Sequence, residues 1–225
     1  MDSYERGKFL VALALTGVAG CVDAIAFLKL KHLFVSFMSG DSTHIAVATS
    51  GGMWAQALSP ATIVALYLFG VIVGRLLAHL SRLWHRPLIL LLEALLLLTA
   101  ALVSQAHSMV MLPMALAMGM QSAAMHRVGQ TKVHLAYVTG TLVNFAEKLT
   151  DALISGCHSE RWQWLPYLLQ WVALIIGAAL GAQAYGAWRI EALLAPSAAL
   201  GALALVTALL SRSGADQAEE LGGRS

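Results

Sequence analysis

Three acidic side chains lie inside stretches of sequence that are otherwise apolar enough to form membrane helices. Asp23 follows a long apolar run, Asp41 lies in a second mostly apolar segment, and Glu93 interrupts a run of leucines. An ionisable group inside lipid costs about 3 kcal/mol or more unless it faces protein or water, so such groups usually have a function. The pattern therefore predicts carboxyl groups that carry a proton or a cation, or that form hydrogen bonds between helices. Both roles stay open for Asp23 and for Glu93.

The segment around Asp41 combines a helix breaker with good N-cap residues in the stretch S-G-D-S-T at residues 39–43. We expect a discontinuous helix whose free amides and hydroxyls bind a ligand at membrane depth; a plain interfacial turn is the alternative. His44 follows Asp41 by one helical turn and could share a proton with it, but two such residues do not make a metal site. The candidate pathway residues here are Ser39, Gly40, Asp41, Thr43 and His44.

A related motif in the second half of the chain is V-T-G-T at residues 138–141. Polar residues then recur at helical spacing, which places them on one helix face beside Lys148. A solvated amphipathic face and a proton relay both explain this stripe. The candidate residues of the motif and the stripe are Thr139, Gly140, Thr141, Asn144, Glu147 and Asp151.

The composition predicts an integral membrane protein. The 225 residues are 59% hydrophobic and only 12% charged, about half the charged fraction of an ordinary soluble domain. The formal net charge of +2 gives no basis for nucleic-acid binding. The two cysteines show no metal-binding spacing, and the sequence lacks the common motifs of soluble enzymes. We therefore expect no cofactor, no metal and no enzyme activity of a soluble type.

Hydropathy divides the chain into an N-terminal cytoplasmic tail at 1–8, a membrane domain, and a disordered C-terminal tail at 212–225. A window of about 20 residues predicts six membrane-spanning helices. A cleaved signal peptide is the alternative for the first of them. The expected spans are 9–30, 60–80, 87–105, 109–126, 164–186 and 191–211.

The topology depends on two weaker segments, 33–50 and 134–154. If neither crosses the membrane, the protein has six spans and inverted halves; if both cross, it has eight spans and parallel halves. The six-span arrangement places more of the Lys and Arg residues on the cytoplasmic side, so the positive-inside rule favours it. The expected fold is thus an all-α polytopic membrane bundle of about six spans with two broken or partly inserted helices.

Two internal repeats are predicted, at 9–105 and 109–211. The sequence G-C-V-D-A, which begins at Gly20, leads to S-G-D, and G-M-Q-S-A, which begins at Gly119, leads to T-G-T at a similar distance. Paired glycines also recur in the third segment of each half, and glycine on a membrane helix usually allows close helix packing. The residues assigned to helix packing are Gly17, Gly20, Gly70, Gly74, Gly177 and Gly181.

These same motifs resemble the YoaK-like family of bacterial multi-span membrane proteins, a domain of unknown function. The likeness extends over about residues 9–211 and rests on G-x-x-D-A-I-A-F-L from Gly20, on the M-S-G-D stretch, on Glu93 in its leucine run and on V-T-G-T. The family commonly has Thr-Gly-Asn where this chain has S-G-D, so an amide is replaced by an acid at Asp41. The resemblance implies about six spans in the inner membrane and brings no substrate.

The leading hypothesis is a secondary transporter or channel-like permease for a small polar solute, with proton coupling through Asp23 and Glu93. The first alternative is a membrane scaffold that binds lipid or a partner protein through a basic stripe. An integral-membrane enzyme is the second alternative. The expected location is the bacterial inner membrane, with the bilayer and a small solute as partners and a homo-oligomer compatible with the glycine faces. The basic stripe comprises Arg75, His79, Arg82 and Arg86.

Overall fold

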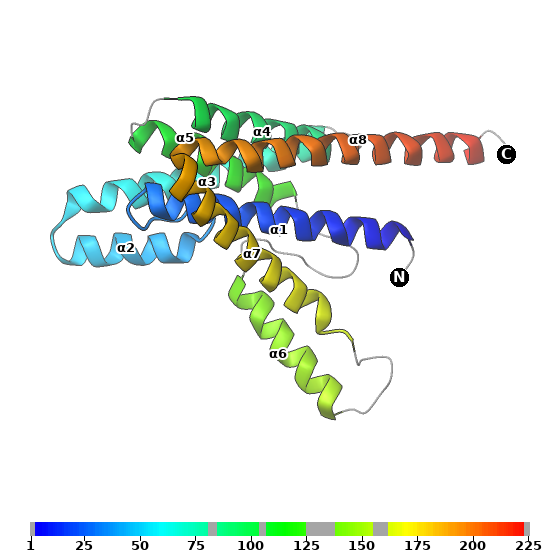
Figure 1. Ribbon diagram of the computed structural model, residues 1–225, viewed down its shortest axis with the longest axis horizontal. Helices are drawn as coiled ribbons and strands as arrows, with labels where there is room; N and C mark the ends of the chain where they lie inside the picture. Colours follow the sequence, from blue (N-terminus) through cyan, green and yellow to red (C-terminus); the bar gives the residue numbers. More distant parts are fainter. Residues whose placement is uncertain (1–2, 81–84, 104–106, 125–137, 155–161, 223–225) are drawn as a thin grey trace.

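The computed structural model describes residues 3–80, 85–103, 107–124, 138–154 and 162–222, and all regular structure in them is helical (Figure 1). The helices are, in chain order, α1 (Ser3–Lys29), α2 (Met38–Ser50), α3 (Trp54–Leu80), α4 (His85–Leu102), α5 (His107–Ala124), α6 (Val138–Ile154), α7 (Leu165–Trp188), the 3₁₀ helix η1 (Arg189–Leu193) and α8 (Leu194–Gly222).

Four stretches of the described residues are long and apolar enough to cross a membrane: Phe9–Lys29, Trp54–Leu80, His85–Leu102 and Leu165–Leu209. The last is 45 residues long and covers α7, η1 and part of α8, whereas a single span needs about 20 residues. Helix α5 contributes a shorter apolar stretch, Val110–Ala123. With 13 and 17 residues, α2 and α6 are the shortest α-helices in the described part of the chain.

The ends of the chain differ from the sequence-based expectation. Helix α1 begins at Ser3, so the residues before Phe9 extend the first helix. Helix α8 continues to Gly222, where a disordered tail was expected. The added segment of α8 contains Ala, Gln, Glu and Leu and lacks proline, and these residues favour helix.

The core lies where α1, α4, α5, η1 and α8 meet. Its fully buried side chains include Leu15, Leu97, Met114, Leu193 and Leu200, one from each of these helices. The outward faces remain apolar: Phe69 and Leu76 of α3, for example, are 57% and 56% exposed. A bundle with an apolar core and apolar outer faces fits a membrane environment.

Helices α1 and α7 cross at backbone contact. A methyl group at Gly20 would overlap the carbonyl oxygen of Leu174, and one at Gly177 would overlap the carbonyl oxygen of Gly17. Gly181 likewise leaves no room against Cys21. Only glycine lets the two helices approach this closely.

The crossing of α3 and α5 is built in the same way. A methyl group at Gly119 would overlap the carbonyl oxygen of Tyr67, and one at Gly70 would lie 2.5 Å from the carbonyl oxygen of Leu116. Gly74 lies against Met120, since its added methyl would be 3.0 Å from that carbonyl oxygen. At each crossing, three glycines leave no room for a methyl group: Gly20, Gly177 and Gly181 at the first, and Gly70, Gly74 and Gly119 at the second.

The remaining contacts arrange the other helices around these two crossings. Helix α4 packs along α8, α2 packs along α3, and α6 packs along α7. Among the described helices α6 contacts α7 alone, and Figure 1 shows it at the margin of the bundle. The start of α1 and the end of α8 point toward the same end of the molecule (Figure 1).

Candidate functional site

Asp23 holds the loop that joins α1 to α2. Its Oδ1 atom accepts hydrogen bonds from the backbone N–H groups of Val35 and Ser36, each at 3.0 Å. Its Oδ2 atom accepts a hydrogen bond from the Ser36 hydroxyl. Three donors from one loop therefore surround this carboxylate, and hydrogen bonds to a charged acceptor are the stronger kind.

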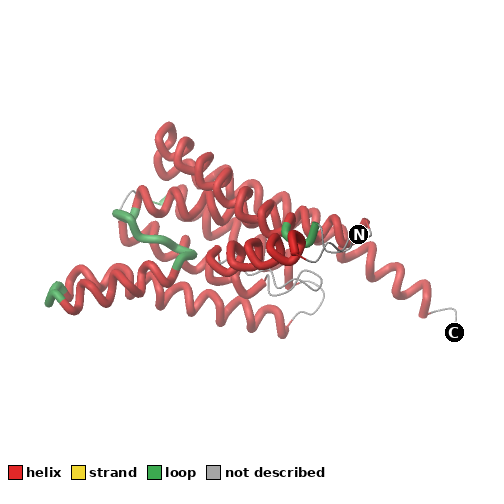
Figure 2. The backbone as a smooth tube through the Cα atoms, turned by 90° about the horizontal axis from the view of Figure 1, so that it is seen from below, coloured by secondary structure: helices red, strands yellow, loops and turns green. Residues whose placement is uncertain are grey.

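These bonds also show that the chain folds back along α1. Asp23 lies six residues before Lys29, the last residue of α1, which corresponds to about 9 Å of helix. The loop, the longest green segment of Figure 2, returns to the level of Asp23 before α2 begins at Met38. The N-terminus of α2 thus lies well inside the end of α1.

The reversal uses two non-glycine residues in the left-handed region, Lys31 at φ 55° and His32 at φ 71°. Aromatic rings then pack around the turn: Phe27 lies 4.7 Å from the ring of His32 and 5.0 Å from that of Phe34. These contacts compensate for the local cost of the left-handed residues, which is about 1–2 kcal/mol each.

The position of the break corrects the sequence-based prediction. A break was expected at Ser39 and Gly40, but α2 is continuous from Met38 to Ser50 and the irregular segment precedes it. Because Gly40 lies in the first turn of α2, it does not interrupt the helix. The hydroxyls of Ser42 and Thr43 donate to helix carbonyls one turn earlier and are not freed for a ligand.

Asp41 is buried in the first turn of α2. Its side chain has no exposed surface, and its Oδ1 atom accepts a hydrogen bond of 3.3 Å from the Phe34 N–H. The Oδ2 atom has no hydrogen-bond partner within the described residues. Burial raises the pKa of Asp41 to about 6; the Phe34 amide and His44 act against this rise and Asp23 adds to it.

The other candidate residues of α2 lie at its surface. Ser39, Thr43 and His44 are exposed, and Gly40 is half-buried against the ring of Phe37. The structure therefore brings Asp23 and Asp41 to the same loop, while the neighbouring polar residues point outward.

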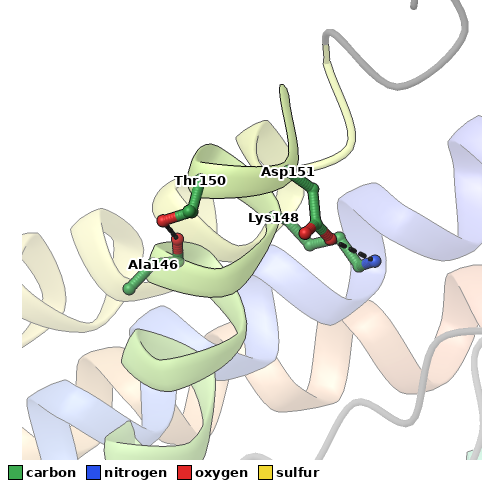
Figure 3. Close-up of polar contacts among 4 residues, drawn as sticks. All are labelled: Ala146, Lys148, Thr150 and Asp151. Carbon is green, nitrogen blue, oxygen red and sulfur yellow. Dashed lines mark hydrogen bonds and ion pairs between the residues drawn. The ribbon is translucent and has the colours of Figure 1, made fainter. Parts of the chain in front are cut away.

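The stripe on α6 is solvent-facing or lipid-facing in this structure. Asn144 and Glu147 are exposed, and no described residue of α6 is buried. Lys148 and Asp151 form an ion pair of 3.2 Å on this surface, and Figure 3 shows the two side chains pointing toward each other. Helix α6 begins at Val138 and contains Thr139, Gly140 and Thr141 in its first turn, so the expected break in this segment also does not fall at the glycine.

Glu93 has a different environment from every other described acid. It lies on the buried face of α4, has no exposed surface, and neither carboxyl oxygen has a hydrogen-bond partner in the described part of the chain. The next residue, Ala94, accepts a 2.7 Å hydrogen bond from the hydroxyl of Ser197 on α8. Glu93 is therefore one residue before a point of contact between α4 and α8.

Sequence reasoning did not find several of these polar groups. The hydroxyl of Ser36, in the loop, donates to Asp23 of α1, and the hydroxyl of Ser197 of α8 donates to Ala94 of α4. Tyr67 donates a 2.8 Å hydrogen bond to Ser122 across the α3 and α5 crossing. Gln121 is buried on α5, and its Nε2 atom is unpartnered within the described residues. Except for Ser36, which lies in a loop, these are polar side chains in apolar helices, the same signal that singled out the acids and the polar residues of the S-G-D and T-G-T motifs.

Groups of three or more His, Cys, Asp or Glu residues able to hold a metal ion do not occur among the described residues. Arg82 of the basic stripe lies outside the described residues.

The helices and their apolar faces define a helical membrane protein. The chain belongs to the family described as protein of unknown function, DUF1275, whose model matches residues 11–206. It is 28% identical to the UPF0700 transmembrane protein YoaK of Bacillus subtilis over 158 residues, which cover 66% of this chain and 69% of the relative. It is 32% identical to the UPF0700 transmembrane protein RA0705 of Rhizobium meliloti over 176 residues, which cover 78% and 75%. No solved structure matches the chain.

Proposed function

We propose that the protein is a permease of the bacterial inner membrane that moves a small polar solute together with a proton or another cation. The observation that carries this proposal is Glu93, a carboxyl group with no exposed surface and no described hydrogen-bond partner inside a membrane-grade helix. An unpaired carboxylate is costly in such surroundings, so this carboxyl holds a proton or a cation.

The arrangement of the helices supports a six-span protein built from two inverted repeats. In such a scheme α1 corresponds to α5, α2 to α6, α3 to α7 and α4 to α8. The glycine crossing of α1 with α7 then corresponds to that of α5 with α3, including the pairs Gly20 to Leu174 and Gly119 to Tyr67. The packing of α2 on α3 likewise corresponds to that of α6 on α7.

The same scheme gives Glu93 a central place. Helix α4 packs on its own counterpart α8, so the axis that relates the repeats passes between them. Transporters built from inverted repeats commonly bind substrate and coupling ion at the repeat interface near the middle of the membrane. We place Glu93 near that interface because the next residue, Ala94, accepts a hydrogen bond from Ser197 of α8.

Asp23 and Asp41 have a supporting role in this proposal. The loop between α1 and α2 turns back into the membrane, and α2 leaves it again as a short re-entrant helix. Asp23 anchors the loop through Val35 and Ser36, and Asp41 adds a contact to Phe34. The two acids thus fix the entrance of the pathway, and Glu93 carries the coupled cation.

The test is uptake by proteoliposomes with an imposed proton gradient. A mixture of amino acids, organic acids and sugars is supplied outside, and mass spectrometry measures what accumulates. We expect gradient-dependent accumulation of at least one solute by the wild type, loss of it in Glu93→Gln, and full retention in Glu147→Gln. Glu147 is an exposed acid of α6, so this variant controls for the removal of one carboxylate.

Thermal unfolding in detergent shows whether Glu93→Gln remains folded. Uptake that is equal in Glu93→Gln and the wild type would remove Glu93 from the mechanism. Uptake by the wild type no greater than that of empty liposomes would contradict the permease itself.

A further inference from the structure

An apolar groove of about 830 Å³ runs along the crevice between α1, α7 and α8. Its walls include Leu13 and Val18 of α1, Ile176 and Leu180 of α7, and Ala199 of α8. The groove is open along its length and has almost no polar surface, Gln183 being the most polar of its lining residues.

The groove lies within stretches that are apolar enough to span the membrane, Phe9–Lys29 and Leu165–Leu209. A groove in such a position opens to the hydrocarbon interior of the bilayer and not to water. An apolar chain that fills it gains dispersion contacts on three sides, which a flat helix surface does not offer. The shape therefore suits one acyl chain.

One end of the groove carries groups that suit a phosphate. Trp188 lines that end and is 62% exposed, as expected for a tryptophan at the membrane interface. Arg189 follows directly at the start of η1, is exposed, and has no carboxylate partner in the described part of the chain. Its guanidinium carbon lies 6.0 Å from the centre of the Tyr185 ring, which holds it at the end of α7.

The backbone at Arg189 is strained for a residue other than glycine. Its φ angle is 52° and its ψ angle is −132°, a combination that glycine adopts at much lower cost than other residues. An arginine in that place accepts a local cost of about 1–2 kcal/mol. A guanidinium binds a phosphate through two parallel hydrogen bonds, which a lysine cannot match.

We propose that this groove is a binding site for an anionic phospholipid of the bilayer, with one acyl chain between α1, α7 and α8 and the phosphate on Arg189. The site is separate from Glu93 and does not depend on the permease proposal. It also differs from the basic stripe, of which Arg75 and His79 lie on α3 and Arg86 lies on α4.

The test uses phosphatidylglycerol with a photoreactive diazirine in one acyl chain, mixed into phosphatidylcholine vesicles that hold the purified full-length protein. After illumination, peptide mass spectrometry locates the label. We expect it on the groove faces of α1 and α7, at Leu13, Ile176 and Leu180. Arg189→Gln should lower this labelling about fivefold to tenfold, as the loss of a charge-assisted contact does.

Two pairs of variants sharpen the test. Ala199→Trp fills the groove and should abolish its labelling, whereas Ala198→Trp, an exposed neighbour outside the groove, should not. Lys31→Gln removes another exposed base and should also leave the label in place. Gel filtration and thermal unfolding verify that each variant is folded.

Three results would overturn the proposal. Label spread evenly over exposed apolar faces such as Leu68 and Phe69 of α3 would show only the lipid that surrounds any membrane helix. Groove labelling that Arg189→Gln leaves undiminished would remove the phosphate contact. An unlabelled groove in a dimer that Ala199→Trp dissociates would assign the groove to a second copy of the chain.

Discussion

The loop around Asp23 and the helix contact around Glu93 place the same chemical group in two opposite situations. Asp23 accepts hydrogen bonds from three donors of a neighbouring loop, whereas Glu93 has none from the described residues. A carboxylate that is fully hydrogen-bonded stabilises the fold, and one that is buried without partners does so only after it takes up a cation or a proton. An acid inside an apolar helix can thus either stabilise the fold or bind a cation or proton, and the number of hydrogen-bond donors around it distinguishes the two roles.

Among the variants that test this contrast, Asp23→Ala should change the free energy of unfolding the most. The change removes the acceptor for two backbone N–H groups and the Ser36 hydroxyl, so we expect the free energy of unfolding to fall by about 3 kcal/mol or more. Denaturant unfolding in detergent micelles measures it, with Glu147→Ala on exposed α6 as the control. A loss below about 0.5 kcal/mol, as for an ordinary surface position, would mean that the loop is held by other contacts.

Glu93→Gln should change the free energy of unfolding in the opposite direction. An amide of the same shape avoids the burial of an ionisable group, so we expect the free energy of unfolding to rise by about 1–2 kcal/mol while transport is lost. Parallel measurements of unfolding and proteoliposome uptake give both quantities. Destabilisation as large as that of Asp23→Ala would make Glu93 a structural group and remove the contrast.

Asp41 is intermediate between Asp23 and Glu93, because one of its carboxyl oxygens has a hydrogen-bond donor and the other has none among the described residues. Its burial predicts that the stability of the fold depends on pH. Its folded-state pKa of about 6 is above the ordinary value of 3.8, because burial disfavours the charged carboxylate. The folded state is therefore favoured by protonated Asp41, and this stabilisation is complete below about pH 4 and is lost as the pH rises through 6. Asp41→Asn should remove this dependence and add on the order of 1 kcal/mol at pH 7. Melting temperatures between pH 4 and 7.5 test it, and parallel curves for wild type and variant would refute it. The charged or titratable groups that act on Asp41 are Asp23 and His44.

The smallest effect is expected for Asp151→Asn. Its ion pair with Lys148 is exposed, so the free energy of unfolding should change by less than about 0.5 kcal/mol. The same denaturant titration checks this value. A change of several times that size would indicate that α6 covers a partner surface in solution, and α6 would then no longer serve as the neutral reference for the two acids.

The helical membrane class could be predicted from the sequence because apolar runs of span length are a strong signal. The family could be recognised from the short motifs near Gly20 and V-T-G-T, and the matched model confirms it. The partner of Asp23 could not be found in this way, since Val35 and Ser36 have no distinguishing composition and become donors only through the reversal of the chain.

The position at which the chain reverses after α1 also could not be predicted from the sequence. Sequence reasoning places a break at glycine, but the left-handed residues here are Lys31 and His32, which the aromatic packing of Phe27 supports. The glycine of the motif, Gly40, is an ordinary first-turn residue of α2. The packing of Phe27 on His32 and the hydrogen bonds from Val35 and Ser36 to Asp23 hold this conformation.

The glycine crossings have a mechanical consequence. Because α1 and α7 touch through their backbones, and α3 and α5 do the same, neither pair can slide or tilt internally without collision of main-chain atoms. Each pair is therefore a rigid unit, whereas α4 and α8 pack against each other without such glycine contacts among the described residues. A motion of one pair relative to the other would change the packing of α4 on α8, where Ala94, the residue after Glu93, is hydrogen-bonded to Ser197.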